Sequence, residues 1–240
     1  MHSISRDDAR RRLIFALDVP DLRSGIDILQ RVEGQVGVVK IGLELFTACG
    51  PSAVEEVMKR GFDVFLDLKL HDIPNTVKGA VRMARSLGVS MLTIHTGGGE
   101  QMMSRAAEEA GDGMTLLGVT LLTSLGAEDL EPVAILPKPT EVVQRRAALA
   151  AKSGLGGIVC SPKEIKSVRD ATSDRVAIVT PGIRPPGAEL GDQKRAATPD
   201  SAIADGADYL VVGRPIRTAN DPAATASSIV DAIAKALTAR

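Results

Sequence analysis

The chain has 240 residues, 44% of them hydrophobic, which is enough to bury the core of one large domain or two small ones. Its 29 basic and 30 acidic residues nearly balance, and this argues against a general nucleic-acid-binding protein, which usually carries a basic excess. No apolar run approaches the roughly 20 residues that a membrane helix needs, and the polar start lacks the apolar stretch of a secretory signal. Cys49 and Cys160 do not form a metal-binding or redox spacing. We therefore expect a reduced, soluble cytoplasmic protein without membrane or nucleic-acid partners.

Short apolar runs alternate with amphipathic runs along the whole chain. The apolar runs are rich in branched residues, as is typical of buried parallel strands, and the others show helical periodicity or helix start signals. Strands are predicted at residues 13–19, 36–41, 64–70, 91–96, 115–122, 157–160, 177–180 and 209–212. Helices are predicted at residues 22–32, 52–59, 77–87, 100–110, 141–152, 162–170, 200–205 and 222–237.

Eight strand–helix units predict an α/β fold, a (β/α)8 TIM barrel, as a single domain over residues 1–240 with residues 1–11 as a polar N-terminal segment. The alternative is a doubly wound open sheet, which the number of units disfavours. No Gly-x-Gly-x-x-Gly motif follows the first predicted strand. The connections at 123–140 and 181–199 are long, and such loops are either mobile lids or ordinary surface excursions.

The third predicted strand carries charges where a structural strand would carry valine or isoleucine. Alternation places Phe65, Asp67 and Lys69 on one face and leucines on the other. Burying such ions costs on the order of several kcal/mol each unless partners or function compensate, so we interpret these charges and the nearby Asp72 as catalytic. Together with Lys40 they form a set with no net charge. Flanking carboxylates favour the ammonium form of Lys69, which suits a proton donor and not a Schiff-base nucleophile.

Polar residues also gather where the other predicted strands end, the face at which barrel enzymes place their active sites. Gly213 and Arg214 follow the eighth strand and Arg184 follows the seventh. Glycine lets backbone amides approach an anion and arginine supplies a planar fork of donors, so this set indicates a phosphate site. We interpret His95, at the end of the fourth strand, as a hydrogen-bonded structural residue and assign no role to His71.

A longer motif then becomes visible around the charged strand. Residues 67–76 have the pattern Asp-x-Lys-x-x-Asp-Ile-Pro-x-Thr. With supporting segments in order along the chain, it resembles the orotidine 5′-phosphate decarboxylase family from the first predicted strand to the eighth. The supporting segments are residues 16–18, 39–42, 119–124, 180–184, 192–193 and 211–214.

The resemblance implies decarboxylation of orotidine 5′-monophosphate (OMP) to UMP, the last step of de novo pyrimidine biosynthesis, without a metal or an organic cofactor. It implies that Lys69 is the cation and proton donor to C6 of the base, and that Asp67, Asp72 and Lys40 complete the charged set. It also implies a homodimer in which one chain reaches into the partner's site through Asp72, Ile73 and Thr76. The implied substrate contacts are Asp18 and Lys40 to the ribose, Thr123 or Ser124 to the pyrimidine edge, and Arg184, Gln193, Gly213 and Arg214 to the phosphate or the lid over it.

Three other interpretations share parts of this pattern. Related sugar-phosphate barrels, such as keto-gulonate-phosphate decarboxylases and hexulose-phosphate synthases, share Asp-x-Lys-x-x-Asp but use Mg2+ to stabilise an enediolate. A class-I aldolase is disfavoured because it needs a neutral lysine. A non-catalytic nucleotide-binding protein is disfavoured because buried ions without a chemical role would be a standing cost.

Overall fold

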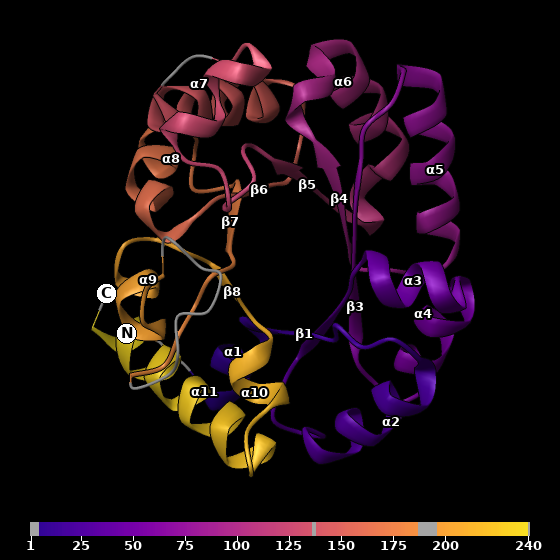
Figure 1. Ribbon diagram of the computed structural model, residues 1–240, viewed down its shortest axis with the longest axis vertical. Helices are drawn as coiled ribbons and strands as arrows, with labels where there is room; N and C mark the ends of the chain where they lie inside the picture. Colours follow the sequence, from indigo (N-terminus) through magenta and orange to yellow (C-terminus); the bar gives the residue numbers. More distant parts are fainter. Residues whose placement is uncertain (1–4, 136–137, 187–195, 240) are drawn as a thin grey trace.

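The computed structural model describes residues 5–135, 138–186 and 196–239. Eight parallel strands close into a barrel in sequence order, and the last strand pairs with the first (Figure 1). This closure confirms the predicted barrel and excludes the open sheet, which would leave two unpaired edges. The strands are β1 (Leu13–Ala16), β2 (Val38–Ile41), β3 (Asp63–Leu70), β4 (Met91–His95), β5 (Thr115–Val119), β6 (Gly157–Val159), β7 (Ala177–Thr180) and β8 (Tyr209–Val212).

Helices surround the ring of strands (Figure 1). Several begin at a proline, whose fixed φ and missing N–H suit the first helical turn, and Asp21, Thr198 and Asp221 cap three of them with their side chains. None in the described ranges combines the length and apolarity needed to cross a membrane. The helices are α1 (Arg6–Arg11), α2 (Leu22–Arg31), α3 (Leu43–Cys49), α4 (Pro51–Met58), α5 (Pro74–Ser86), α6 (Gly99–Ala110), α7 (Pro139–Lys152), α8 (Ile165–Ala171), α9 (Pro199–Ala204), α10 (Arg214–Arg217) and α11 (Pro222–Thr238).

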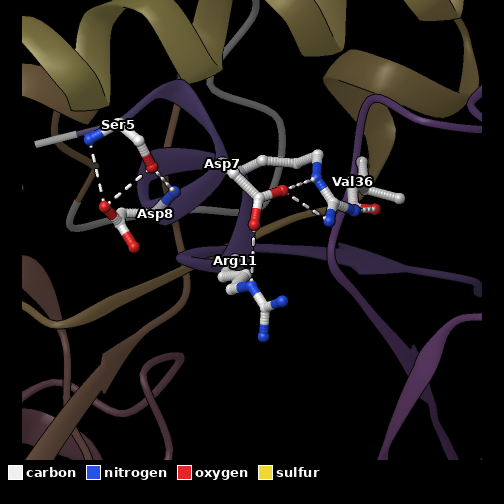
Figure 2. A network of polar contacts seen from close by, with 6 residues as sticks. Ser5, Asp7, Asp8, Arg11 and Val36 are labelled. Carbon is white, nitrogen blue, oxygen red and sulfur yellow. Dashed lines mark hydrogen bonds and ion pairs between the residues drawn. The ribbon is translucent and has the colours of Figure 1, made fainter.

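The polar N-terminal segment contains a helix, α1, that the apolar periodicity did not predict. The amide N–H of Asp8 donates to Ser5 Oγ (3.1 Å), while the Asp8 carboxylate accepts from the Ser5 amide (3.0 Å), which completes a capping box (Figure 2). Arg10 donates to the carbonyl of Val36 (3.0 Å), just before β2, and Ala9 is fully buried. Local polar contacts and one buried alanine therefore hold this helix against the barrel.

The barrel interior has an apolar floor and a charged mouth. One core cluster joins inward-facing residues of seven strands, among them Ile14, Val38, Phe65, Met91 and Leu117. Alternation along a strand brings every second residue to the same face, so Lys40, Asp67 and Thr93 follow Val38, Phe65 and Met91 in the same inward columns. The fold therefore brings these polar groups together above the floor, at the carboxyl ends of the strands.

Strand β3 departs from the regular strand predicted at residues 64–70. Its pairing with β4 passes from Leu66↔Leu92 to Leu70↔Ile94, so a step of four residues in β3 (70 − 66) faces a step of two in β4 (94 − 92). Within this bulge Lys69 has a φ of 50°, in the left-handed region that costs a non-glycine residue roughly 1–2 kcal/mol. The bulge therefore changes the direction of the chain at Lys69, the residue predicted to be the catalytic cation.

Candidate active site

Four charged side chains form a row of alternating sign at the barrel mouth. Lys40 Nζ lies 3.1 Å from Asp18 Oδ1 and 3.4 Å from Asp67 Oδ2, and Lys69 Nζ lies 2.8 Å from Asp67 Oδ1. The side chains of Lys40 and Asp67 are 11% and 12% exposed, and that of Lys69 is 33% exposed. The row therefore runs from a solvated aspartate, through a buried ion pair, to an ammonium group that solvent or a ligand can reach.

Asp67 is the centre of this row. Burial would raise its pKa, but the charges of Lys40 and Lys69 and the hydrogen bonds from Lys69 and Thr93 together bring the pKa below its ordinary value. The carboxylate therefore stays ionised at neutral pH. An ionised Asp67 holds the charged form of Lys69 in a fixed direction, as a preorganised cation requires.

Thr93 is part of this site, although the sequence analysis did not select it. Its hydroxyl donates to Asp67 Oδ1 (2.9 Å) and accepts from the backbone N–H of Lys69 (2.9 Å), and the side chain is fully buried. The signal that could have identified it is its place two residues after Met91 on the inward face of β4. Thr93 couples the carboxylate to the turn that carries the ammonium.

A cavity of about 150 Å³ lies beside the row of charges. Its walls combine Lys40, Asp67 and Lys69 with Thr123 and a set of apolar side chains, which include Phe65, Val119, Leu121, Val159 and Val211. Such a mixture suits a flat ring that meets charge at one edge only. A larger cavity, of about 640 Å³ between α9 and α11, lies away from this row, so we assign the site on its chemistry and not on its size.

Two arginines that were predicted to bind phosphate, Arg184 and Arg214, are near enough for their charges to interact. Arg184 is buried, and burial followed by the positive charge of Arg214 lowers the pKa of its guanidinium. A Cβ added to Gly213 would lie 3.2 Å from Ala16 Cβ and 3.7 Å from Asp18 Oδ2, so the bare glycine lets the end of β8 approach the end of β1. Two cations whose charges interact at the barrel mouth form a favourable environment for an anion.

The predicted residues that follow β3 do not join the row within one chain. Asp72, Ile73 and Thr76 are exposed, and the carboxylate of Asp72 accepts from the Ile73 amide (2.6 Å). Among the ion pairs of the described ranges, none connects Asp72 to Lys69. Asp72 and Ile73 precede α5 and Thr76 lies in its first turn, so all three are on the exposed surface of their own chain.

The remaining predicted residues divide into three groups. Thr123 lines the cavity, whereas Ser124 is exposed beside it. Gln193 lies outside the described residues.

Within the ranges that the structure describes, no cluster of three or more His, Cys, Asp or Glu side chains could hold a metal ion.

His95 accepts a hydrogen bond at Nδ1 from the Gly97 amide (3.3 Å), in line with the structural role predicted for it. Burial, followed by the positive charges of His71, Arg146 and Lys69, lowers its pKa to about 4. The imidazole is therefore neutral at physiological pH. Arg146 in turn donates to the carbonyl of Thr120 (2.7 Å) at the end of β5, a contact that the sequence did not reveal.

Comparisons with known proteins show which proteins this chain is similar to. The model of the orotidine 5′-phosphate decarboxylase / HUMPS family matches residues 11–229. The orotidine 5′-phosphate decarboxylase of Anaeromyxobacter sp. (strain K) is 50% identical over 218 residues, which are 91% of this chain and 96% of that protein. The one from Moorella thermoacetica is 47% identical over 238 residues, 95% of this chain and 94% of that protein. A crystal structure of orotidine 5′-phosphate decarboxylase from Lactobacillus acidophilus superposes with a TM-score of 0.83 at 36% identity, covering 93% of this chain and 99% of that one.

Proposed function

The chain belongs to the orotidine 5′-phosphate decarboxylase / HUMPS family, and from that premise we propose that it decarboxylates OMP to UMP. Its similarity to orotidine 5′-phosphate decarboxylases, at 50% identity over 91% of the chain, makes it a carboxy-lyase of pyrimidine biosynthesis. The observation that carries the proposal for this particular site is the ammonium group of Lys69, fixed at 2.8 Å from the ionised Asp67 beside a largely apolar cavity.

The chemistry needs a fixed positive charge next to C6 of the base. When the bond between C6 and the carboxylate carbon breaks, CO2 leaves and the electron pair stays on C6. Lys69 stabilises that charge and then transfers an Nζ proton to C6, after which the neutral amine regains a proton from solvent. A cation that is already oriented in a site of low polarity stabilises such charge without reorganisation.

The cavity has room for the base and not for the whole nucleotide. Its volume of about 150 Å³ is well below the roughly 300–1,000 Å³ that is usual for ligand pockets. We therefore place the pyrimidine in the cavity with Thr123 or Ser124 at its edge, and the ribose beside Asp18 and Lys40. The phosphate then lies towards the loops after β7 and β8, and the residues assigned to it are Arg184, Gln193, Gly213 and Arg214.

The binding of the phosphate, far from C6, contributes to catalysis in this scheme. Energy gained from a remote part of a substrate can be used to close loops and to orient the reacting group. Asp67 also lies where the substrate carboxylate would arrive, so ionic repulsion there would be relieved as CO2 leaves.

We propose a homodimer in which Asp72, Ile73 and Thr76 act in the partner's site. Ile73 is 68% exposed, and Leu43 and Met83 are 57% and 56% exposed. An apolar groove of about 420 Å³ lies between α3, α4 and α5, with Phe46, Leu68, Leu70 and Met83 in its walls. Exposed apolar area of this kind, next to a catalytic carboxylate, supports an interface between copies of the chain.

A charge at the exposed isoleucine tests the dimer. We expect Ile73→Asp to leave the unfolding free energy of the monomer within about 0.5 kcal/mol, because the side chain is mostly in solvent. The variant should sediment as a monomer and lose activity. Val133→Asp, at a side chain that is 59% exposed on the 3-10 helix Glu131–Val133 after β5, is the control and should remain dimeric. An active monomeric Ile73→Asp variant would contradict action across the interface.

The activity is tested by incubating the purified protein with OMP and EDTA and following the fall in ultraviolet absorbance. We expect turnover in EDTA, whereas the Mg2+-dependent relatives would lose activity. Lys69→Ala should abolish turnover but still bind UMP, because the residues assigned to the phosphate and ribose of UMP do not include Lys69. Lys59→Ala, at the C-cap of α4 where the side chain is 68% exposed, is the matched control and should behave as wild type. Near-normal activity of Lys69→Ala would refute the assignment.

A further inference from the structure

Two histidine rings stack at the barrel mouth, beside the row of charges. The ring centroids of His71 and His95 are 5.2 Å apart and the planes differ by 17°. His95 follows Met91 and Thr93 in the inward column of β4, whereas His71 lies just beyond the end of β3. The stack therefore connects the turn after Lys69 with the end of the neighbouring strand.

The short 3-10 helix η1 (Thr96–Gly98) contributes two glycines that lie against the ring of His71. A Cβ added to Gly97 would lie 3.4 Å from His71 Cε1 and 3.3 Å from His95 Nδ1. A Cβ added to Gly98 would lie 3.3 Å from His71 Cδ2. The bare backbone of η1 thus lets the exposed histidine approach closely, and the Gly97 amide fixes the orientation of the His95 ring.

Strand β4 consequently contacts the turn around Lys69 at two points. Thr93 accepts the Lys69 amide at 2.9 Å, and His95 stacks on His71 two residues further along. Between these points Lys69 has its left-handed φ of 50°. A strained backbone of this kind persists only where its surroundings hold it, and strained residues concentrate at functional sites.

We propose that His71 is a positioning residue, whose ring, held by His95 and the Gly97–Gly98 backbone, keeps the turn of residues 69–72 in the conformation that directs Lys69 at the substrate. This inference rests on the proposed decarboxylase function and adds a residue to it. His71 acts through the backbone and need not touch the substrate. Burial, followed by the charges of His71, Arg146 and Lys69, favours a neutral His95 ring in the stack.

The expected signature is a loss of kcat at a nearly constant KM. A misplacement of about 1 Å at a catalytic group costs on the order of 100-fold in rate, and Thr93 still anchors one side of the turn. We therefore expect His71→Ala to lower kcat by about 5- to 20-fold. The KM for OMP should stay within about twofold, because the ribose and phosphate contacts come from other strands. His71→Phe, which keeps a flat ring, should recover kcat to within about twofold of wild type.

Hydrogen exchange supplies a second readout that does not depend on activity. The amides of residues 70–72 should exchange faster in His71→Ala than in wild type and return towards wild-type rates in His71→Phe. Arg82→Ala, an exposed change on α5, is the control and should alter neither kcat nor this exchange.

Three results would overturn the inference: a His71→Phe variant as impaired as His71→Ala, a loss confined to KM, or a loss that disappears at high protein concentration and so reflects dimer dissociation. If wild-type protein does not decarboxylate OMP, the proposed function fails, and the exchange rates alone still decide whether His71 holds the turn. If wild type is active and His71→Ala matches it in both readouts, only the positioning role fails.

Discussion

Replacement of the buried threonine beneath the catalytic turn gives the sharpest test of how the site is held. Thr93→Val keeps the shape of the side chain but removes the hydroxyl that donates to Asp67 and accepts from the Lys69 amide, both at 2.9 Å. A buried amide without a partner costs about 1–3 kcal/mol, and a hydrogen bond to a charged group contributes about 1.5–3 kcal/mol. Asp67 keeps its lysine partners, so we expect a combined loss of about 2–4 kcal/mol in the free energy of unfolding.

Urea denaturation of Thr93→Val and Thr93→Ser measures this loss. The serine variant keeps the hydroxyl and lacks only a methyl group, so it should lose about 1 kcal/mol. Equal m-values across the three proteins would show that the change is one of stability and not of the compactness of the unfolded state. The reasoning is refuted if the valine variant lies within about 0.5 kcal/mol of wild type, or if serine is as damaging as valine.

Three other predictions concern separate parts of the molecule. The pKa of His95 falls from its ordinary 6.5 to about 4 on folding, so the unfolded chain binds the proton first and the free energy of unfolding decreases as the pH drops through this window. After a discount for partial solvent screening we expect a decrease of about 1–2 kcal/mol, which His95→Gln should lack in urea titrations at pH 7 and pH 4.5. Gly79→Ala on α5, where a Cβ would have no neighbour within 4 Å, should raise the free energy of unfolding by about 0.5–1 kcal/mol. Gly157→Ala, whose Cβ would lie 2.9 Å from a backbone oxygen of β7, should lower it by about 1–3 kcal/mol. Thermal or urea unfolding of both variants measures the difference. Arg214→Ala should weaken UMP binding by about 10- to 100-fold in calorimetry and leave uridine binding unchanged, and an equal loss for both ligands would contradict a phosphate role.

The order of the elements could be predicted because it depends on local information. A buried parallel strand needs a short run of branched apolar residues, and a helix on its surface needs an apolar stripe with a start signal. Helix α1 was missed because it has no apolar stripe from which a helix could be predicted. Local capping and one buried alanine hold it in place. Helix α3 was also missed, because it has only seven residues and buries only Leu45, so it shows no clear apolar stripe.

The charges of the candidate site were visible in the sequence for the same reason. Asp67 and Lys69 occupy positions of a strand that burial would otherwise fill with apolar side chains, and this conflict is evident from residues 65–70 alone. Lys40 and Asp18 could be added because barrel strands all end at one face. The row of ion pairs at 2.8–3.4 Å agrees with that expectation.

Only the tertiary structure decided how these charges are oriented. The bulge in β3, the left-handed Lys69, the double hydrogen bond of Thr93 and the stack of His71 on His95 all depend on the register between β3 and β4, whose facing residues are separated by more than twenty positions in the chain. Alternation along one strand contains no information about register with the next. The sequence by itself therefore determined which residues carry the chemistry and at which end of the barrel they lie, while the closure of the barrel decided which neighbour holds each of them and in which direction it points.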